Sequence, residues 1–331
     1  MDASWLQVER LGARLWLEAG SVLPYLVAGV LVEATIRTFK WHVKVRHVLG
    51  RMGAFSIPAA TVLGLASPLC ACATLPLVIS LVRAGLPLAP AMSLLVASPL
   101  MSPGAYAMLT AMLGSGWANA VLFSAASLGL GAGFVAHLLK ERGFGSHDHL
   151  LRDLPDGDFH DPDYPVEHLR CECGKQLSNR LEHHHHGRFV VFLAKAGEGA
   201  WKIGRLVALG VLVEVVVSTV VPAAWVTALL TTGGAWPILL LTFATIPLHL
   251  PQVTAASLVF GYFLPDPGQT IPLAKGAGIA LLVGGPVTAL PVMAVFLTLF
   301  RPRVFVLYLV TCVVGTLALA FGFEWLPVKL G

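Results

Sequence analysis

Long apolar stretches, separated by short polar ones, dominate the pattern of this chain. Six stretches of 20 residues or more contain no Lys or Arg: residues 17–36, 88–113, 117–139, 206–230, 277–300 and 304–323. A helix needs about 20 apolar residues to cross a bilayer. Backbone groups must be paired within lipid, and the regular alternation of a barrel strand is absent, so the pattern predicts helices. The expected fold is an all-α polytopic membrane protein.

Composition excludes a soluble domain. Of the 331 residues, 56% are hydrophobic and 12% are charged, whereas soluble domains are about 25% charged. The formal net charge of +4 does not indicate a nucleic-acid partner, because the basic residues mostly flank the apolar stretches. Asp2 and Glu9 precede the first stretch, which is unlike a cleavable signal peptide. The expected partner is the lipid bilayer.

Sequence similarity divides the chain into two halves. GVLVE at residues 29–33 recurs at 210–214, and LLVASP at 94–99 is echoed by LLVGGP at 281–286. Between these matches, PLCAC at 68–72 is the counterpart of PLHLP at 247–251. We therefore predict a first membrane repeat over residues 1–140, a polar loop over 141–200 and a second membrane repeat over 201–331.

The distribution of basic residues predicts the topology. Cytoplasmic connections carry an excess of Lys and Arg, and the first connection carries Arg37, Lys40, Lys44, Arg46 and Arg51. The next segment, 54–82, either crosses the membrane, giving about eight full spans, or forms a re-entrant hairpin that breaks at Pro68. The hairpin keeps the basic residues that follow in the cytoplasm. The same rule makes 236–263 a hairpin that enters from outside.

Three spans and one hairpin in each half is an odd number, so the two repeats are expected to be inverted. Many secondary transporters have this architecture, with broken helices that meet near the midplane. The loop between the repeats is then cytoplasmic.

The tip of the first hairpin carries a pair of thiols. Cys70 and Cys72 lie between Pro68 and Pro76, and thiolates select soft cations. The alternative is two small buried hydrophobic residues, and we assign Cys312 to that class. His249, the counterpart of Cys70 in the second half, is either a ligand or a hydrogen-bonded core histidine.

Prolines and hydroxyls interrupt the later segments of both halves. Ser98 and Ser102 each precede a proline, and Thr288 follows Pro286. Proline leaves a backbone carbonyl without its helical partner, so these sites are candidates for substrate binding. Gln252 and Thr254 are expected to line the break near His249.

One acid recurs within the first long span of each half. Glu33 and Glu214 occupy the same position of the repeated motif. An acid within a span costs about 2.5–3.5 kcal/mol on insertion scales, which makes both candidates for proton coupling. For Glu33 the alternative is an interfacial ion pair with Arg37.

The polar loop is rich in metal ligands, but their spacing matches no closed four-ligand zinc module. We expect a chelating arm that captures or senses metal. Its candidate ligands are His147, His149, His160, His168, Cys171, Cys173, His183, His184, His185 and His186.

The sequence PLCACATLP at residues 68–76, together with Ser98-Pro99, resembles the ArsP-like permease family, whose hallmark is Pro-Leu-Cys-Ser-Cys-Gly followed by Leu-Pro. The resemblance covers both hydrophobic halves and implies an efflux permease for trivalent organoarsenicals. A branch with a Cys/His-rich central loop is linked to copper and zinc efflux, and this chain is more similar to that branch. The family's functional cysteines correspond to Cys70 and Cys72, while Ala71 and Ala73 replace the hallmark Ser and Gly.

These observations predict an inner-membrane permease that exports a soft metal or metalloid ion by alternating access. No Gly-x-x-x-x-Gly-Lys-Ser/Thr motif occurs, so an ion gradient rather than ATP is the expected energy source. We expect no enzymatic activity and no resident cofactor, and homo-oligomerisation is left open. The alternatives are a membrane thiol-disulfide oxidoreductase, or a channel or importer for another small solute.

Overall fold

The computed structural model describes six continuous segments: residues 51–67, 86–141, 189–198, 234–248, 274–287 and 300–325. It also describes single positions between them: 12, 20, 23, 27, 30, 31, 34, 35, 38, 48, 49, 74, 77, 78, 81, 82, 200, 201, 204, 205, 208, 252, 255, 256, 259, 293, 296 and 297.

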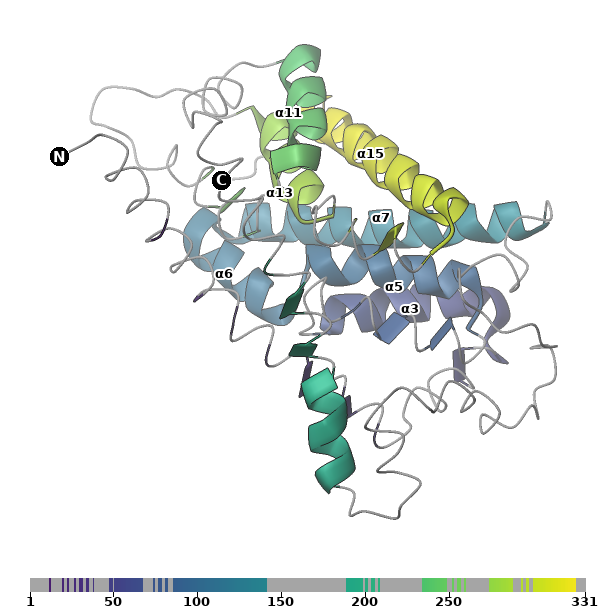
Figure 1. Cartoon of the computed structure of the whole chain (residues 1–331). Helices are drawn as coiled ribbons and strands as arrows, with labels where there is room; N and C mark the ends of the chain where they lie inside the picture. The colour runs from purple at the N-terminus through teal and green to yellow at the C-terminus, as the bar shows by residue number, and fades with distance from the viewer. Residues whose placement is uncertain are drawn as a thin grey trace.

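All labelled elements within the described residues are helices (Figure 1). They are η1 (Gly53–Phe55), α3 (Ser56–Ala66), α5 (Leu88–Leu100), α6 (Pro103–Leu113), α7 (Ser115–Glu141), α11 (Ala235–Leu248), α13 (Lys275–Val287) and α15 (Pro302–Trp325). The prediction of an all-α fold is confirmed for this part of the chain.

Three of the predicted spans are helical segments long and apolar enough to cross a membrane: Leu88–Leu113, Ser115–Lys140 and Pro302–Trp325. The first is interrupted, because α5 ends at Leu100 and α6 begins at Pro103. The predicted span at 277–300 starts with α13, whose 13 residues measure about 20 Å against a hydrocarbon core of about 30 Å. The predicted spans 17–36 and 206–230 lie mostly outside the described residues.

In the first half, α3 and α7 both pack against α5, and glycines on α7 allow the approach. A Cβ built at Gly133 would stand 2.7 Å from Ile57 Cγ2 on α3 and 3.2 Å from the carbonyl oxygen of Ala89 on α5. One turn earlier, a Cβ at Gly129 would stand 3.1 Å from Thr61 Cγ2 and 3.0 Å from Ala97 Cβ. Helix α3 therefore runs parallel to α5, and α7 runs antiparallel to both.

The second half packs α11, α13 and α15 in the same order and direction. A Cβ built at Gly276, near the start of α13, would stand 2.6 Å from Ile238 Cδ1 on α11 and 2.7 Å from the carbonyl oxygen of Ala320 on α15. At Gly284 it would stand 2.9 Å from Thr245 Oγ1 and 3.6 Å from Thr316 Cγ2. Glycine is needed at both positions because any side chain would collide with a neighbouring helix.

The two triplets of packed helices, α3–α5–α7 and α11–α13–α15, make their closest contacts at equivalent sequence positions. Ala89 and Ala97 on α5 correspond to Gly276 and Gly284 on α13, a shift of 187 positions in each case. Gly129 and its counterpart Thr316 obey the same shift. Helices α5 and α13 each have 13 residues and carry a proline next to last. This shared packing supports the internal repeat, while its inversion across the membrane stays a prediction.

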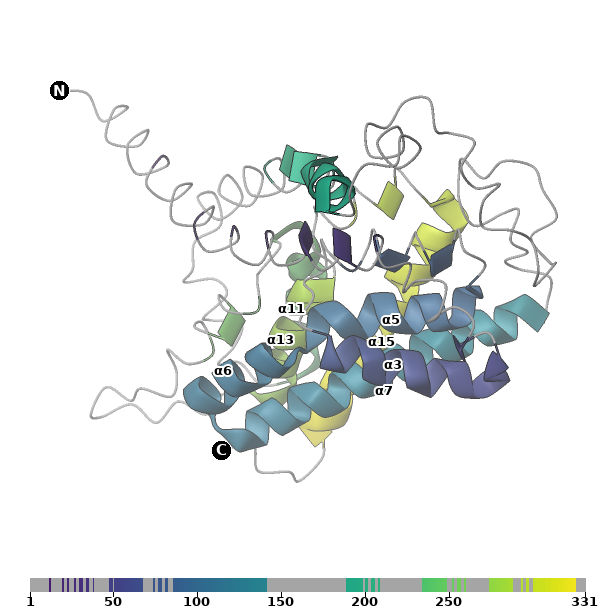
Figure 2. The ribbon, with the colours of Figure 1, turned by 90° about the horizontal axis from the view of Figure 1, so that it is seen from below.

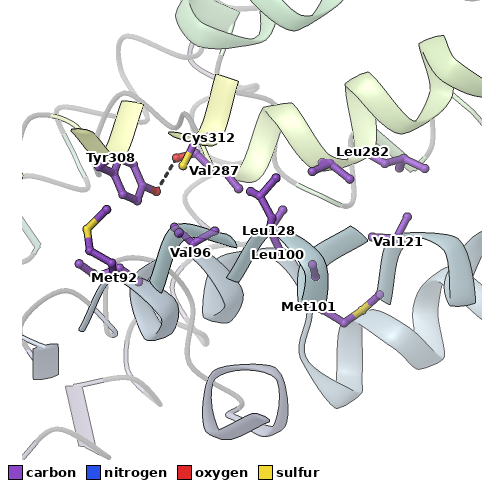
Figure 3. Packing of buried hydrophobic residues seen from close by; sticks show 14 of the residues in the cluster. Met92, Val96, Leu100, Met101, Val121, Leu128, Leu282, Val287, Tyr308 and Cys312 are labelled. Atoms are coloured by element: carbon purple, nitrogen blue, oxygen red, sulfur yellow. Dashed lines mark hydrogen bonds between the residues drawn. The ribbon is translucent and has the colours of Figure 1, made fainter. Parts of the chain in front are cut away.

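The two triplets share one hydrophobic core. Helix α15 packs against α7, and α13 packs against both α5 and α7, so the middle helices of the two triplets lie close together (Figure 2). Figure 3 shows Leu282 and Val287 of α13 facing Val121 and Leu128 of α7 and Leu100 of α5. The C-terminal ends of α5 and α13 are therefore buried inside the protein.

Candidate functional site

The third segment of the first half breaks where its prolines predicted. Met101 and Ser102 have extended backbones (φ −150°, ψ 131° and φ −130°, ψ 163°), and α6 starts at Pro103. The hydroxyl of Ser102 accepts a hydrogen bond of 3.2 Å from the backbone N–H of Ala105, which caps the new helix. Ser102 thus has a structural role in shaping the break.

Ser98, one turn before the break, hydrogen-bonds to Thr74. Their hydroxyl oxygens are 2.7 Å apart and both side chains are buried. Thr74 follows Cys72 by two residues, and it is a residue that the sequence analysis missed. Its hydroxyl, two positions after the thiol pair, was the only feature of the local sequence that indicated a role for Thr74. The residue to which it bonds is 24 positions away.

Both ends of the cysteine-bearing stretch, residues 68–73, are held at this part of α5. On the N-terminal side, a Cβ built at Gly64, near the end of α3, would stand 3.1 Å from Ala97 Cβ and 3.2 Å from the backbone nitrogen of Ser98. On the C-terminal side, Thr74 bonds to Ser98. From there the chain returns to Leu86, two residues before α5 begins. The described residues on both sides agree with a hairpin over 54–82, and the hairpin itself stays a prediction.

The second half reaches the same break through Gln252. Its side-chain amide Nε2 donates a hydrogen bond of 2.8 Å to the carbonyl oxygen of Leu100, the last residue of α5. The last carbonyls of a helix have no partner within it. A side chain 152 positions away therefore satisfies this buried group. Gln252 was expected at a helix break, and it lies at the break of the first half.

The end of α13 is satisfied in a similar way. The hydroxyl of Tyr308 on α15 donates a hydrogen bond of 2.9 Å to the carbonyl oxygen of Val287 (Figure 3). The ring of Tyr308 stacks on Phe296 with 5.0 Å between centroids, which holds the hydroxyl in place. Leu100 and Val287 are equivalent under the shift of 187. The sequence analysis missed Tyr308 because a tyrosine in an apolar span carries no local sign of such a partner.

Most of the predicted site residues lie outside the described residues, so their geometry is not tested. This group comprises Cys70, Cys72, His249, Thr288, Glu33, Glu214 and the ligands of the polar loop, His147, His149, His160, His168, Cys171, Cys173, His183, His184, His185 and His186. Within the described part of the chain, no three His, Cys, Asp or Glu side chains converge on a metal position. Cys312 is buried and free, as predicted.

Comparison with known proteins identifies a family. The sequence profile of a family named ArsP_1, described as a predicted permease, matches residues 17–324. The match covers both helix triplets and the loop between them. No curated protein and no solved structure matches the chain.

Proposed function

Because the chain belongs to this predicted permease family, and is therefore a membrane transporter, we propose that it exports a soft metal or metalloid ion across the inner membrane. The cargo is a copper- or zinc-type cation or a trivalent arsenical. The observation that carries the proposal is the hydrogen bond between Thr74 and Ser98, because it attaches the cysteine-bearing stretch to a broken helix in the core.

Chain length limits how far the thiols are from that bond. Consecutive residues span at most about 3.6 Å each, so Cys72 is within about 7 Å of Thr74 along the chain. Cys70 lies two residues before Cys72 and can therefore be up to twice as far from Thr74. Two thiolates one residue apart in a proline-bounded stretch suit a soft ion, and the hydroxyls of Ser98 and Thr74 add oxygen donors beside them.

The second half contributes from the other side. Gln252 bonds to Leu100, and His249 precedes it by three residues. Thr288 directly follows Val287, whose carbonyl is the counterpart of that of Leu100. We propose that His249 and Thr288 complete the site together with backbone carbonyls freed at Pro99 and Pro286.

Transport would follow alternating access between two inverted repeats, with each triplet moving as a unit. The hydrogen bond from Gln252 to Leu100 joins the repeats, so it is a contact that such movement would break and remake. A proton gradient acting through Glu214 and Glu33 would supply the energy. The 141–200 loop, on the cytoplasmic side, would collect the ion at low concentration.

Metal uptake by sealed inside-out vesicles tests this function against its alternatives. A pump that exports from the cytoplasm accumulates Cu(I), Zn(II) or a trivalent arsenical inside such vesicles, and a protonophore abolishes the accumulation. A channel only equilibrates the ion and is insensitive to the protonophore. A thiol-disulfide oxidoreductase moves no ion and instead changes the redox state of an added dithiol.

A further inference from the structure

An open groove of about 510 Å³ lies between the start of α3 and the C-terminal part of α7. Ala54, Ile57 and Pro58 form one wall, and Leu130, Phe134 and His137 form the other. None of the residues at the α5 break lines it. The groove is therefore separate from the proposed transport site.

Most of the side chains around the groove are exposed and apolar. Phe134 and Leu130 on α7 and Phe55 beside α3 are exposed in spite of their size. On a helix that is long and apolar enough to span a membrane, such a surface is in contact with lipid rather than water. The long part of the groove, from Leu130 to His137, extends about 10 Å along the helix axis.

One end of the groove is basic. His137 lines it, and Lys140 lies one turn further along the same face of α7. Arg51 precedes the wall residue Ala54 by three positions, and both Arg51 and Lys140 are exposed. The packing of α3 against α7 thus brings basic residues from two distant parts of the sequence to one end. The rule that spans carry their Lys and Arg on the cytoplasmic side predicts that this end faces the cytoplasm.

We propose that this groove binds an anionic phospholipid of the cytoplasmic leaflet. One acyl chain lies along Leu130 and Phe134, and the headgroup phosphate is held by Arg51, His137 and Lys140. The groove complements such a lipid, because it is apolar along its length, where the acyl chain lies, and cationic at the end where the anionic phosphate lies. The cytoplasmic leaflet is also the one that attracts basic residues next to a span. The site is independent of the ion that the permease transports.

Native mass spectrometry of the full-length protein in detergent tests the proposal. The protein is titrated with phosphatidylglycerol or phosphatidylcholine of identical acyl chains, and bound lipid is counted. Phosphatidylglycerol is expected to bind more tightly. Arg51→Gln and Lys140→Gln should each weaken its binding about fivefold, with little effect on phosphatidylcholine. Arg303→Gln removes an exposed arginine at the start of α15 and should change nothing.

A groove-filling variant separates the lipid from other occupants. Ala54→Leu adds bulk on the exposed wall and should reduce the binding of both lipids while the monomer mass is kept. Equal binding of the two lipids by the wild type would overturn the proposal, as would undiminished phosphatidylglycerol binding by the Arg51→Gln/Lys140→Gln double variant. A change of oligomeric mass in Ala54→Leu, with lipid binding unchanged, would show instead that the groove is an interface between copies of the chain.

Discussion

The side-chain amide of Gln252, in the second half of the chain, donates a hydrogen bond of 2.8 Å to the carbonyl oxygen of Leu100, in the first half. Leu100 ends the 13-residue helix α5 and is fully buried. The bond therefore joins the two halves of the chain at a point where a helix stops inside the protein. An unpaired carbonyl at this depth would be costly.

Gln252→Met tests this link, because it keeps the length of the side chain and removes the donor without adding a charge. Leaving a buried acceptor without its partner costs about 1–3 kcal/mol, so we expect a clear fall in the thermal unfolding temperature of the purified protein. Tyr106→Phe is the matched control, since it removes an exposed hydrogen bond of 2.7 Å to Asn119 and should have little effect. Equal unfolding temperatures for the wild type and Gln252→Met would mean that the bond does not stabilise the break.

Thr74 and Ser98 can be tested by a double-mutant cycle. Thr74→Val and Ser98→Ala each remove the 2.7 Å hydrogen bond between the two buried hydroxyls and should each destabilise the protein by about 1 kcal/mol. The double variant should be less destabilised than the sum, by about 1 kcal/mol, because one interaction is removed in both singles.

The same variants should affect transport if the bond positions the thiols. Thr74→Val is expected to lower ion uptake about tenfold, while Thr74→Ser, which retains the hydroxyl, should keep most of it. Additive destabilisation together with unchanged uptake would refute a positioning role for this bond.

Sequence reasoning located the break at Ser102 because proline acts locally, through its missing donor and fixed φ. It also predicted the repeat, from LLVASP and LLVGGP, and these motifs lie at the equivalent ends of α5 and α13. It could not find Thr74 or Tyr308, whose partners are set by tertiary packing.

The alignment of the two predicted hairpins could not be settled from the sequence either. Packing places Gly64 opposite Ala97 and Thr245 opposite Gly284, which is a shift of 181 between α3 and α11, whereas 68–72 and 247–251 match with a shift of 179. The equivalence of Cys70 and His249 accordingly stays a prediction.

Helix packing in the second triplet depends on Gly276. Gly276→Ala would place a Cβ 2.7 Å from the backbone oxygen of Ala320, so we expect a destabilisation of about 1–3 kcal/mol, typical of overpacking. At Gly322, also within a helix, a Cβ would have nothing within 4 Å. Gly322→Ala should therefore be neutral or stabilise by up to about 1 kcal/mol. Thermal unfolding of the two variants measures the difference, and a reversed order would contradict the described packing of α13.

The predicted topology can be measured with single cysteines in a cysteine-free background. Ser115→Cys and Gly268→Cys should react with an impermeant thiol reagent on intact cells. Ser146→Cys and Asp158→Cys should react only after permeabilisation, because the excess of basic residues predicts a cytoplasmic loop. Labelling of Ser146→Cys on intact cells would exclude the inverted repeats.

The central claim is that Cys70 and Cys72 bind the transported ion, and uptake of a soft cation or trivalent arsenical by sealed inside-out vesicles tests it most directly. Serine preserves the shape of cysteine and removes the soft sulfur ligand. The Cys70→Ser and Cys72→Ser variants should therefore each lose uptake while still inserting into the membrane. Cys312→Ser, a change at a buried thiol remote from the cysteine pair in sequence, should retain it. Normal uptake by the Cys70→Ser/Cys72→Ser double variant would contradict the account.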